Sequence, residues 1–92
     1  MIVRFKHKGL EKFFTSGSLR GIDAKQSKRL RILLGVLATA TTASEMNVIG
    51  ARLHPLKGKL KDYWSVSVSG NWRLIFRFDN NNATDVDLID YH

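Results

Sequence analysis

Large apolar side chains recur at every second position through much of the last third of the chain. Two such runs, residues 63–69 and 72–78, flank the pair Gly70-Asn71. A period of two is typical of a strand with one buried face, and a glycine beside an asparagine is typical of a tight turn. The pattern therefore predicts an antiparallel β-hairpin.

The positions of the large apolar residues predict the register of this hairpin. A two-residue turn would place Val68 beside Arg73. A three-residue turn, Ser69-Gly70-Asn71, pairs Val68 with Trp72 and gathers the large apolar side chains on one face. We therefore predict the three-residue turn. The opposite, polar face would then carry Tyr63, Ser67, Arg73 and Arg77.

A last strand is predicted over residues 84–91, after the turn-forming cluster Asp79-Asn80-Asn81-Asn82. Its acidic residues Asp85 and Asp87 would point outward, away from the core. By strict alternation Asp90 would lie on the core face and Tyr91 on the polar face. Asp90 would then reach Arg73 only if the strand bends at its end.

The first half of the chain has a short strand over residues 2–6 and then helical spacing. The first helix is marked by Leu10, Phe13 and Phe14, which we expect in the core. Gly17 suits the left-handed position that ends it. Asp23 and Gln26 form the pattern of a capping box, so the main helix is expected from there to about Thr41.

The main helix carries an apolar stripe that would pack on the sheet, namely Leu30, Leu33, Leu34 and Leu37. Ile32 and Val36 point away from this stripe. They are expected either to pack on the first helix or to form an exposed patch for a protein partner. Residues 43–49 predict a short helical turn, and residues 51–62 predict mostly loop.

These elements predict one α+β domain over residues 1–92. Its two helices would cover one face of an antiparallel four-stranded sheet, in the order β-α-α-β-β-β, because each element has one apolar side. The content of 43% hydrophobic and 25% charged residues is that of a folded domain. The other face of the sheet would carry Arg73.

Charge is distributed unevenly along the chain. Residues 1–61 hold 13 of the 15 basic and 3 of the 8 acidic residues, whereas residues 62–92 carry a net charge of −3. This asymmetry indicates a polyanionic partner such as nucleic acid; a surface that is basic only for solubility is the alternative.

The chain has no cysteine, so a disulfide framework is excluded and zinc would have only three histidines. Its start becomes charged too early for a secretory signal. Its longest apolar-rich run, residues 32–43, is shorter than the roughly 20 residues that a membrane span needs. We therefore expect a cytoplasmic protein without a cofactor and without membrane contact.

Two histidines are the candidates for chemistry: His54, in the segment Arg52–Gly58, and His92, after Asp90-Tyr91. RNA supplies its own nucleophile, the 2′-hydroxyl, and its cleavage needs a base, an acid and a fixed positive charge at the phosphate. Histidine titrates near neutral pH, and arginine grips two phosphate oxygens. Taken singly, each of these residues is more often a solvated surface residue, so the hypothesis requires them to meet.

The segments "LHPLKG" at residues 53–58, "NWR" at 71–73 and the terminal "DYH" at 90–92 resemble the HigB branch of the RelE/ParE toxin superfamily. The likeness runs essentially end to end. It implies a toxin of a type II toxin–antitoxin system, a metal-independent endoribonuclease that cleaves messenger RNA in the ribosomal decoding site. It also implies a HigA-like helix-turn-helix antitoxin, through which alone the toxin would meet operator DNA.

Carried over by position, the resemblance implies that the functional residues are His54, Lys57, Arg73, Asp90, Tyr91 and His92. Arg73 and Lys57 would stabilise the phosphate, and the histidines would share the proton transfers. Tyr91 would stack on a base, and Asp90 would position a neighbouring group. Further basic residues would bind RNA phosphates, namely Lys59, Lys61, Arg77, Lys25, Lys28 and Arg29.

Two other functions fit the same chain. A DNA gyrase inhibitor of the ParE type would use the same scaffold, since one fold hosts several functions. It would not need the pair His54 and His92. A non-catalytic RNA-binding module would explain the charge and would tolerate the loss of His92.

Overall fold

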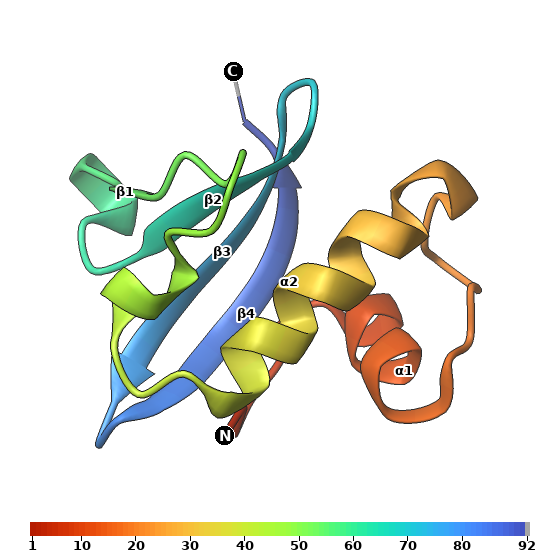
Figure 1. Cartoon of the computed structure of the whole chain (residues 1–92), viewed down its shortest axis with the longest axis horizontal. Coiled ribbons are helices and arrows are strands. Elements are labelled where there is room, and N and C mark those ends of the chain that lie inside the picture. Colours follow the sequence, from red (N-terminus) through yellow and green to blue (C-terminus); the bar gives the residue numbers. More distant parts are fainter. Residues whose placement is uncertain (92) are drawn as a thin grey trace.

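A computed structural model describes residues 1–91 of the chain. Helices precede strands along the sequence, as Figure 1 shows. The elements are α1 (Lys8–Ser16), the 3₁₀ turn η1 (Ala24–Gln26), α2 (Ser27–Thr39), the 3₁₀ turn η2 (Ala43–Met46), β1 (His54–Pro55), the 3₁₀ turn η3 (Gly58–Leu60), β2 (Trp64–Ser69), β3 (Trp72–Asp79) and β4 (Asn82–Asp90).

The sheet has the spatial order β1-β2-β3-β4, and all neighbours are antiparallel. The opening segment runs parallel to β4 on its free side. It pairs through isolated bridges, Ile2 with Ala83 and Phe5 with Val86. The α+β class and the helix-helix-strand order are confirmed, whereas the strand expected over residues 2–6 is reduced to these two bridges.

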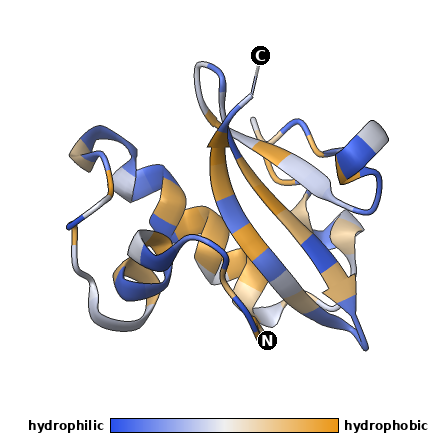
Figure 2. Ribbon diagram, turned by 180° about the vertical axis from the view of Figure 1, so that it is seen from behind, coloured by the Kyte–Doolittle hydropathy of each residue, from blue (hydrophilic) through white to orange (hydrophobic). Residues whose placement is uncertain are grey.

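Both helices cover one face of the sheet and bury the main core against it (Figure 1). The four leucines of the α2 stripe are essentially fully buried. They pack with Leu10 and Phe13 of α1 and with strand residues such as Leu74 and Phe76. Hydrophobic and hydrophilic positions alternate along much of β4 in Figure 2, and Val86 and Leu88 of this strand pack in the main core under the helices.

The other face of the sheet is not simply polar. Leu56, Tyr63 and Ile75 form a second buried cluster there, with Leu60 packed against it. The chain segment that contains η3 folds over the middle of this face and excludes water. Tyr63, expected among polar neighbours, is 7% exposed, and Lys6 lies over its ring at 5.1 Å.

The first hairpin has the predicted register but not the predicted turn. Val66 lies opposite Leu74, and Trp64 lies opposite Phe76, as expected. However, Ser69 already pairs with Trp72, so the turn has two residues, and the three-residue turn is wrong. A register shift between Ser67 and Ser69 makes Val68 the extra residue of a β-bulge, which restores the apolar pairing.

The second hairpin turns at Asn80 and Asn81, both with positive φ, as a two-residue hairpin turn requires. Strand β4 contains a bulge, opposite Phe76 of β3. Asp85 lies in this bulge and has a φ of 52°. This aspartate was expected to point to solvent, but it is 8% exposed. Its carboxylate is paired with Arg4 at 2.6 Å and with Arg77 at 3.2 Å, which accounts for its burial.

The helix ends follow the predicted chemistry in part. Gly17 ends α1 with a φ of 76°. The Asp23 side chain accepts from the backbone N–H of Lys25, but Gln26 does not complete a capping box. Its Nε2 instead donates to Ser69 Oγ at 3.0 Å, which ties the start of α2 to the sheet.

Ile32 and Val36 behave differently from each other. Val36 is half-buried against the main core, whereas Ile32 is 50% exposed. Packing therefore accounts for Val36, whereas Ile32 remains at the surface, and its use as a contact for a partner stays a prediction. Phe14 is also partly exposed rather than buried in the core.

Candidate functional site

The candidate site lies at one end of the sheet, which we call the open end. It comprises the β2–β3 turn, the C-terminal end of β4 and residues 51–54. Backbone hydrogen bonds join these segments, from Ser67 to the Ala51 carbonyl and from Tyr91 to the Asn71 carbonyl. Figure 1 shows β4 ending here, beside the turn between β2 and β3.

His54 is oriented by a hydrogen bond within its own loop. Its Nδ1 lies 3.0 Å from the Arg52 carbonyl oxygen. Because a carbonyl only accepts, Nδ1 must carry a proton, and Nε2 is then the nitrogen that gains or loses one. Arg52 has a φ of 51°, a left-handed conformation that arginine rarely adopts. This conformation brings its carbonyl oxygen within hydrogen-bond distance of the imidazole Nδ1.

Arg73 is held by the turn that precedes it. Its NH1 group donates to the carbonyl oxygens of Gly70 at 2.8 Å and of Trp72 at 3.1 Å. Two contacts through one nitrogen fix the guanidinium plane. They leave the donors on Nε and the second amino group to bind an anion.

His54 and Arg73 lie on the same face of the sheet. His54 pairs with Ser65, Ser65 pairs with Ile75, and Arg73 is two residues from Ile75. From standard strand spacings, their Cα atoms are about 12 Å apart. Side chains of this length span such a distance when both contact a group the size of a phosphodiester.

The C-terminal candidates divide between the two faces. Tyr91 is 42% exposed beside Asn71. It belongs to the same face of the sheet as Arg73, because Arg73 pairs with Ile89, two residues before Tyr91. Asp90 lies opposite Trp72, and Arg73 lies opposite Ile89, so the register directs Asp90 to the helix side. The pairing of β4 with β3 stays regular from Asp87 to Asp90. His92 lies outside the described residues.

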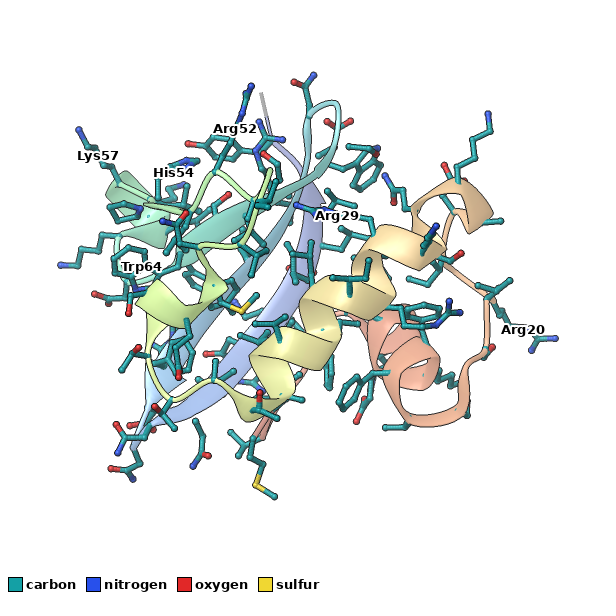
Figure 3. The ribbon with its side chains drawn as sticks, in the orientation of Figure 1. Arg20, Arg29, Arg52, His54, Lys57 and Trp64 are labelled. Carbon is teal, nitrogen blue, oxygen red and sulfur yellow. The ribbon has the colours of Figure 1, made fainter. Side chains whose placement is uncertain are left out.

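The basic candidates also divide. Lys57, Lys59 and Lys61 are exposed around η3, and Figure 3 shows Lys57 at the same corner of the molecule as Arg52 and His54. Arg77 is at the far end of β3, paired with Asp85. Its charge is thus engaged within the fold, which argues against the phosphate contact expected for it.

Arg52 is the residue of the open end to which the sequence reasoning gave no role. It belongs to the segment that was singled out, but only the distance to His54 and the positive φ reveal its part in the site. Arg29 is near the same loop, since its NH2 lies 3.4 Å from the Ile49 carbonyl oxygen. Arg20, by contrast, lies on the opposite side of the molecule from Lys57 (Figure 3).

A cavity of about 330 Å³ lies between α1 and α2, away from the open end. In the described part of the chain, no three His, Cys, Asp or Glu side chains gather in a way that suits a metal ion. No helix among residues 1–91 is both long and apolar enough to cross a membrane.

Comparison with known proteins identifies the family. Residues 3–92 match the model of the HigB-like toxins, described as RelE-like toxins of the type II toxin–antitoxin system HigB. The chain is 42% identical to the endoribonuclease HigB of Proteus vulgaris over 92 residues, the full length of both. Its fold is similar to a chain of the YoeB–YefM complex from Staphylococcus aureus, with a TM-score of 0.65, 22% identity and coverage of 100% of this chain and 95% of that one. The chain therefore belongs to the HigB-like family of RelE-like toxins.

Proposed function

We propose that this toxin is an endoribonuclease that cleaves messenger RNA on the ribosome without a metal ion, by attack of the 2′-hydroxyl on the adjacent phosphorus. The single observation that carries the proposal is that His54 and Arg73 lie on one face of the open end. A hydrogen bond to the Arg52 carbonyl orients His54, and the β2–β3 turn holds Arg73. The full-length relative named endoribonuclease HigB supports the same reaction.

Arg73 would stabilise the charge that develops on the phosphorane. Its guanidinium is preorganised by the Gly70 and Trp72 carbonyls, so little reorganisation is needed when the negative charge appears. Lys57, exposed on the loop after β1, would add a second positive charge. Lys59, Lys61 and the basic helix residues Lys25, Lys28 and Arg29 would hold ribosomal RNA phosphates, which makes ribosome binding steeply salt-dependent.

His54 would serve in proton transfer through Nε2. One histidine accepts the proton of the 2′-hydroxyl as its oxygen bonds to phosphorus. The second donates a proton to the 5′-oxygen as the old P–O bond breaks. The products are a cyclic phosphate and a 5′-hydroxyl. His92 is the proposed partner of His54 in this exchange.

Tyr91 and Asp90 would act around this centre. Tyr91 is exposed beside the turn that holds Arg73, where its ring can stack on an unpaired base. Asp90, directed to the other face, would act on the position of the chain terminus rather than on the phosphate. The proposed partners are a HigA-like helix-turn-helix antitoxin and the ribosome, and the proposed location is the cytoplasm.

The test is to map RNA ends after induction of the toxin in growing cells. New 5′-hydroxyl ends within translated frames are expected, together with growth arrest. The variant Arg73→Ala should be folded and should produce neither. Growth arrest with loss of DNA supercoiling and intact messengers would overturn the proposal in favour of gyrase inhibition. Toxicity without either effect would indicate non-catalytic RNA binding.

A further inference from the structure

The cavity between α1 and α2 has an apolar floor and an open mouth. It is lined by Phe13, Phe14 and Gly17 from the first helix and by Arg31, Leu34 and Gly35 from the second. Arg31 stacks over the Phe13 ring at 5.6 Å and forms one wall. Phe14 is 39% exposed, and Ile32 lies on the same exposed side of α2, so apolar surface extends beyond the cavity.

Gly35 is the residue of this groove that the fold itself does not explain. It lies inside α2, where glycine costs roughly 0.5–1 kcal/mol relative to alanine. A Cβ at this position would meet nothing within 4 Å. No internal packing therefore requires a glycine. The missing side chain only keeps the groove open, as a close approach by another chain would require.

The charge around the groove defines the kind of partner. Helices α1 and α2 together carry five basic residues and one acidic residue, Glu11. A second copy of this chain would bring two basic surfaces together, which is unfavourable. RNA fits the groove poorly, because Arg31 is the one lining residue that could bind a phosphate and the rest of the lining is mainly apolar. An acidic segment with apolar anchors satisfies both the charge and the lining.

We propose that this groove binds an acidic amphipathic segment of the antitoxin, with an apolar side chain of that segment inserted over Gly35. The inference rests on the proposed toxin function. It places the antitoxin on the helical side of the molecule, away from His54 and Arg73. Bound there, the antitoxin would contact Arg31 and the exposed edge of Phe14.

The proposal predicts that one substitution, Gly35→Ala, raises the stability of the toxin and lowers its affinity for the antitoxin, and the test measures both. Gly35→Ala should raise Tm, because alanine favours the helix and its Cβ meets no neighbour. The same variant should bind the antitoxin encoded in the toxin's operon at least tenfold more weakly by calorimetric titration. Gly35→Met, which fills the groove, should abolish binding at this site. Arg31→Glu should weaken binding and flatten its salt dependence.

The matched control is Thr15→Ala on the first helix. Thr15 is exposed and does not line the cavity, so this variant should raise helix stability without changing antitoxin affinity. RNA cleavage by all variants without antitoxin should equal that of the wild type, which separates this inference from the proposed function.

Three outcomes would overturn the inference. The first is unchanged antitoxin affinity in Gly35→Ala and Gly35→Met. The second is a lower Tm in Gly35→Ala, since the space over the helix would then be needed by the fold. The third is self-association of the wild type that Gly35→Met removes, which would make a second copy the occupant.

Discussion

Arg52 combines two features that substitution can separate, its left-handed backbone and its cationic side chain. Its φ of 51° costs a residue with a side chain about 1–2 kcal/mol. Replacement by glycine removes this cost but adds about 0.5–1 kcal/mol of backbone entropy lost on folding. Arg52→Gly should therefore stabilise the protein by about 0.5–1 kcal/mol, a rise in Tm of a few degrees for a domain of this size.

The same backbone orients His54, because the Arg52 carbonyl accepts from Nδ1. Arg52→Gly and Arg52→Asn tolerate the left-handed conformation and should keep that hydrogen bond. Both lose the cation and should raise KM for RNA with little change in kcat. Arg52→Val, whose branched side chain disfavours positive φ, should turn the carbonyl away and lower kcat. Arg52→Lys is the control that retains the charge.

Nitrogen NMR of the His54 ring gives a readout that folding stability does not move. The tautomer protonated at Nδ1 should dominate the neutral ring in the wild type, Arg52→Gly and Arg52→Asn, and it should lose that dominance in Arg52→Val. The reasoning is refuted if Arg52→Val cleaves RNA with an unchanged kcat and an unchanged tautomer. A decrease in Tm on Arg52→Gly would refute the assignment of backbone strain.

Three further predictions concern the cation, the bulge and a helix turn. Arg73→Ala should lower the cleavage rate by about 10²–10³-fold, with partial recovery in Arg73→Lys, in single-turnover assays on programmed ribosomes; equal rates would remove Arg73 from the site. Asp85→Asn keeps the shape and the left-handed backbone but loses the charge facing Arg4 and Arg77, so urea unfolding should show a loss of about 1–2 kcal/mol; unchanged stability would contradict a structural role for these ion pairs. The backbone N–H of Thr41, followed by that of Thr42, lowers the pKa of Glu45. The stability from this contact is present above the ordinary glutamate pKa and is lost as the pH falls through the lowered value, so Glu45→Gln should unfold with a flatter acid dependence, and parallel curves would exclude the effect.

The fold was predictable where side-chain periodicity carries the information. The α2 leucines and the pairing of Val66 with Leu74 follow from which residues must be buried together. The turn of that hairpin did not follow, because a bulge at Val68 satisfies the same burial with one residue fewer in the loop. A three-residue turn and a two-residue turn with a bulge place the same side chains on the buried face, so the alternation of apolar residues does not distinguish them.

The candidate site was predictable only as a set of residue types. Resemblance selected His54 and Arg73, and the register places them on one face. The burial of Asp85 was missed, because one of its two partners, Arg4, is about eighty residues away in sequence. The ion pair of Arg77 was missed with it, because it is formed with that buried carboxylate. The orientation of His54 by a main-chain carbonyl has no side-chain pattern that a sequence could display.

At both edges of the sheet, only a few residues make regular backbone pairs with the neighbouring strand. One border is the two-residue strand β1, and the other is an opening segment that touches β4 through only two bridges. Long unprotected borders are where β-proteins join one another into aggregates. A second chain would therefore have few positions for strand addition here, because β1 is short and the opening segment already occupies part of the free side of β4.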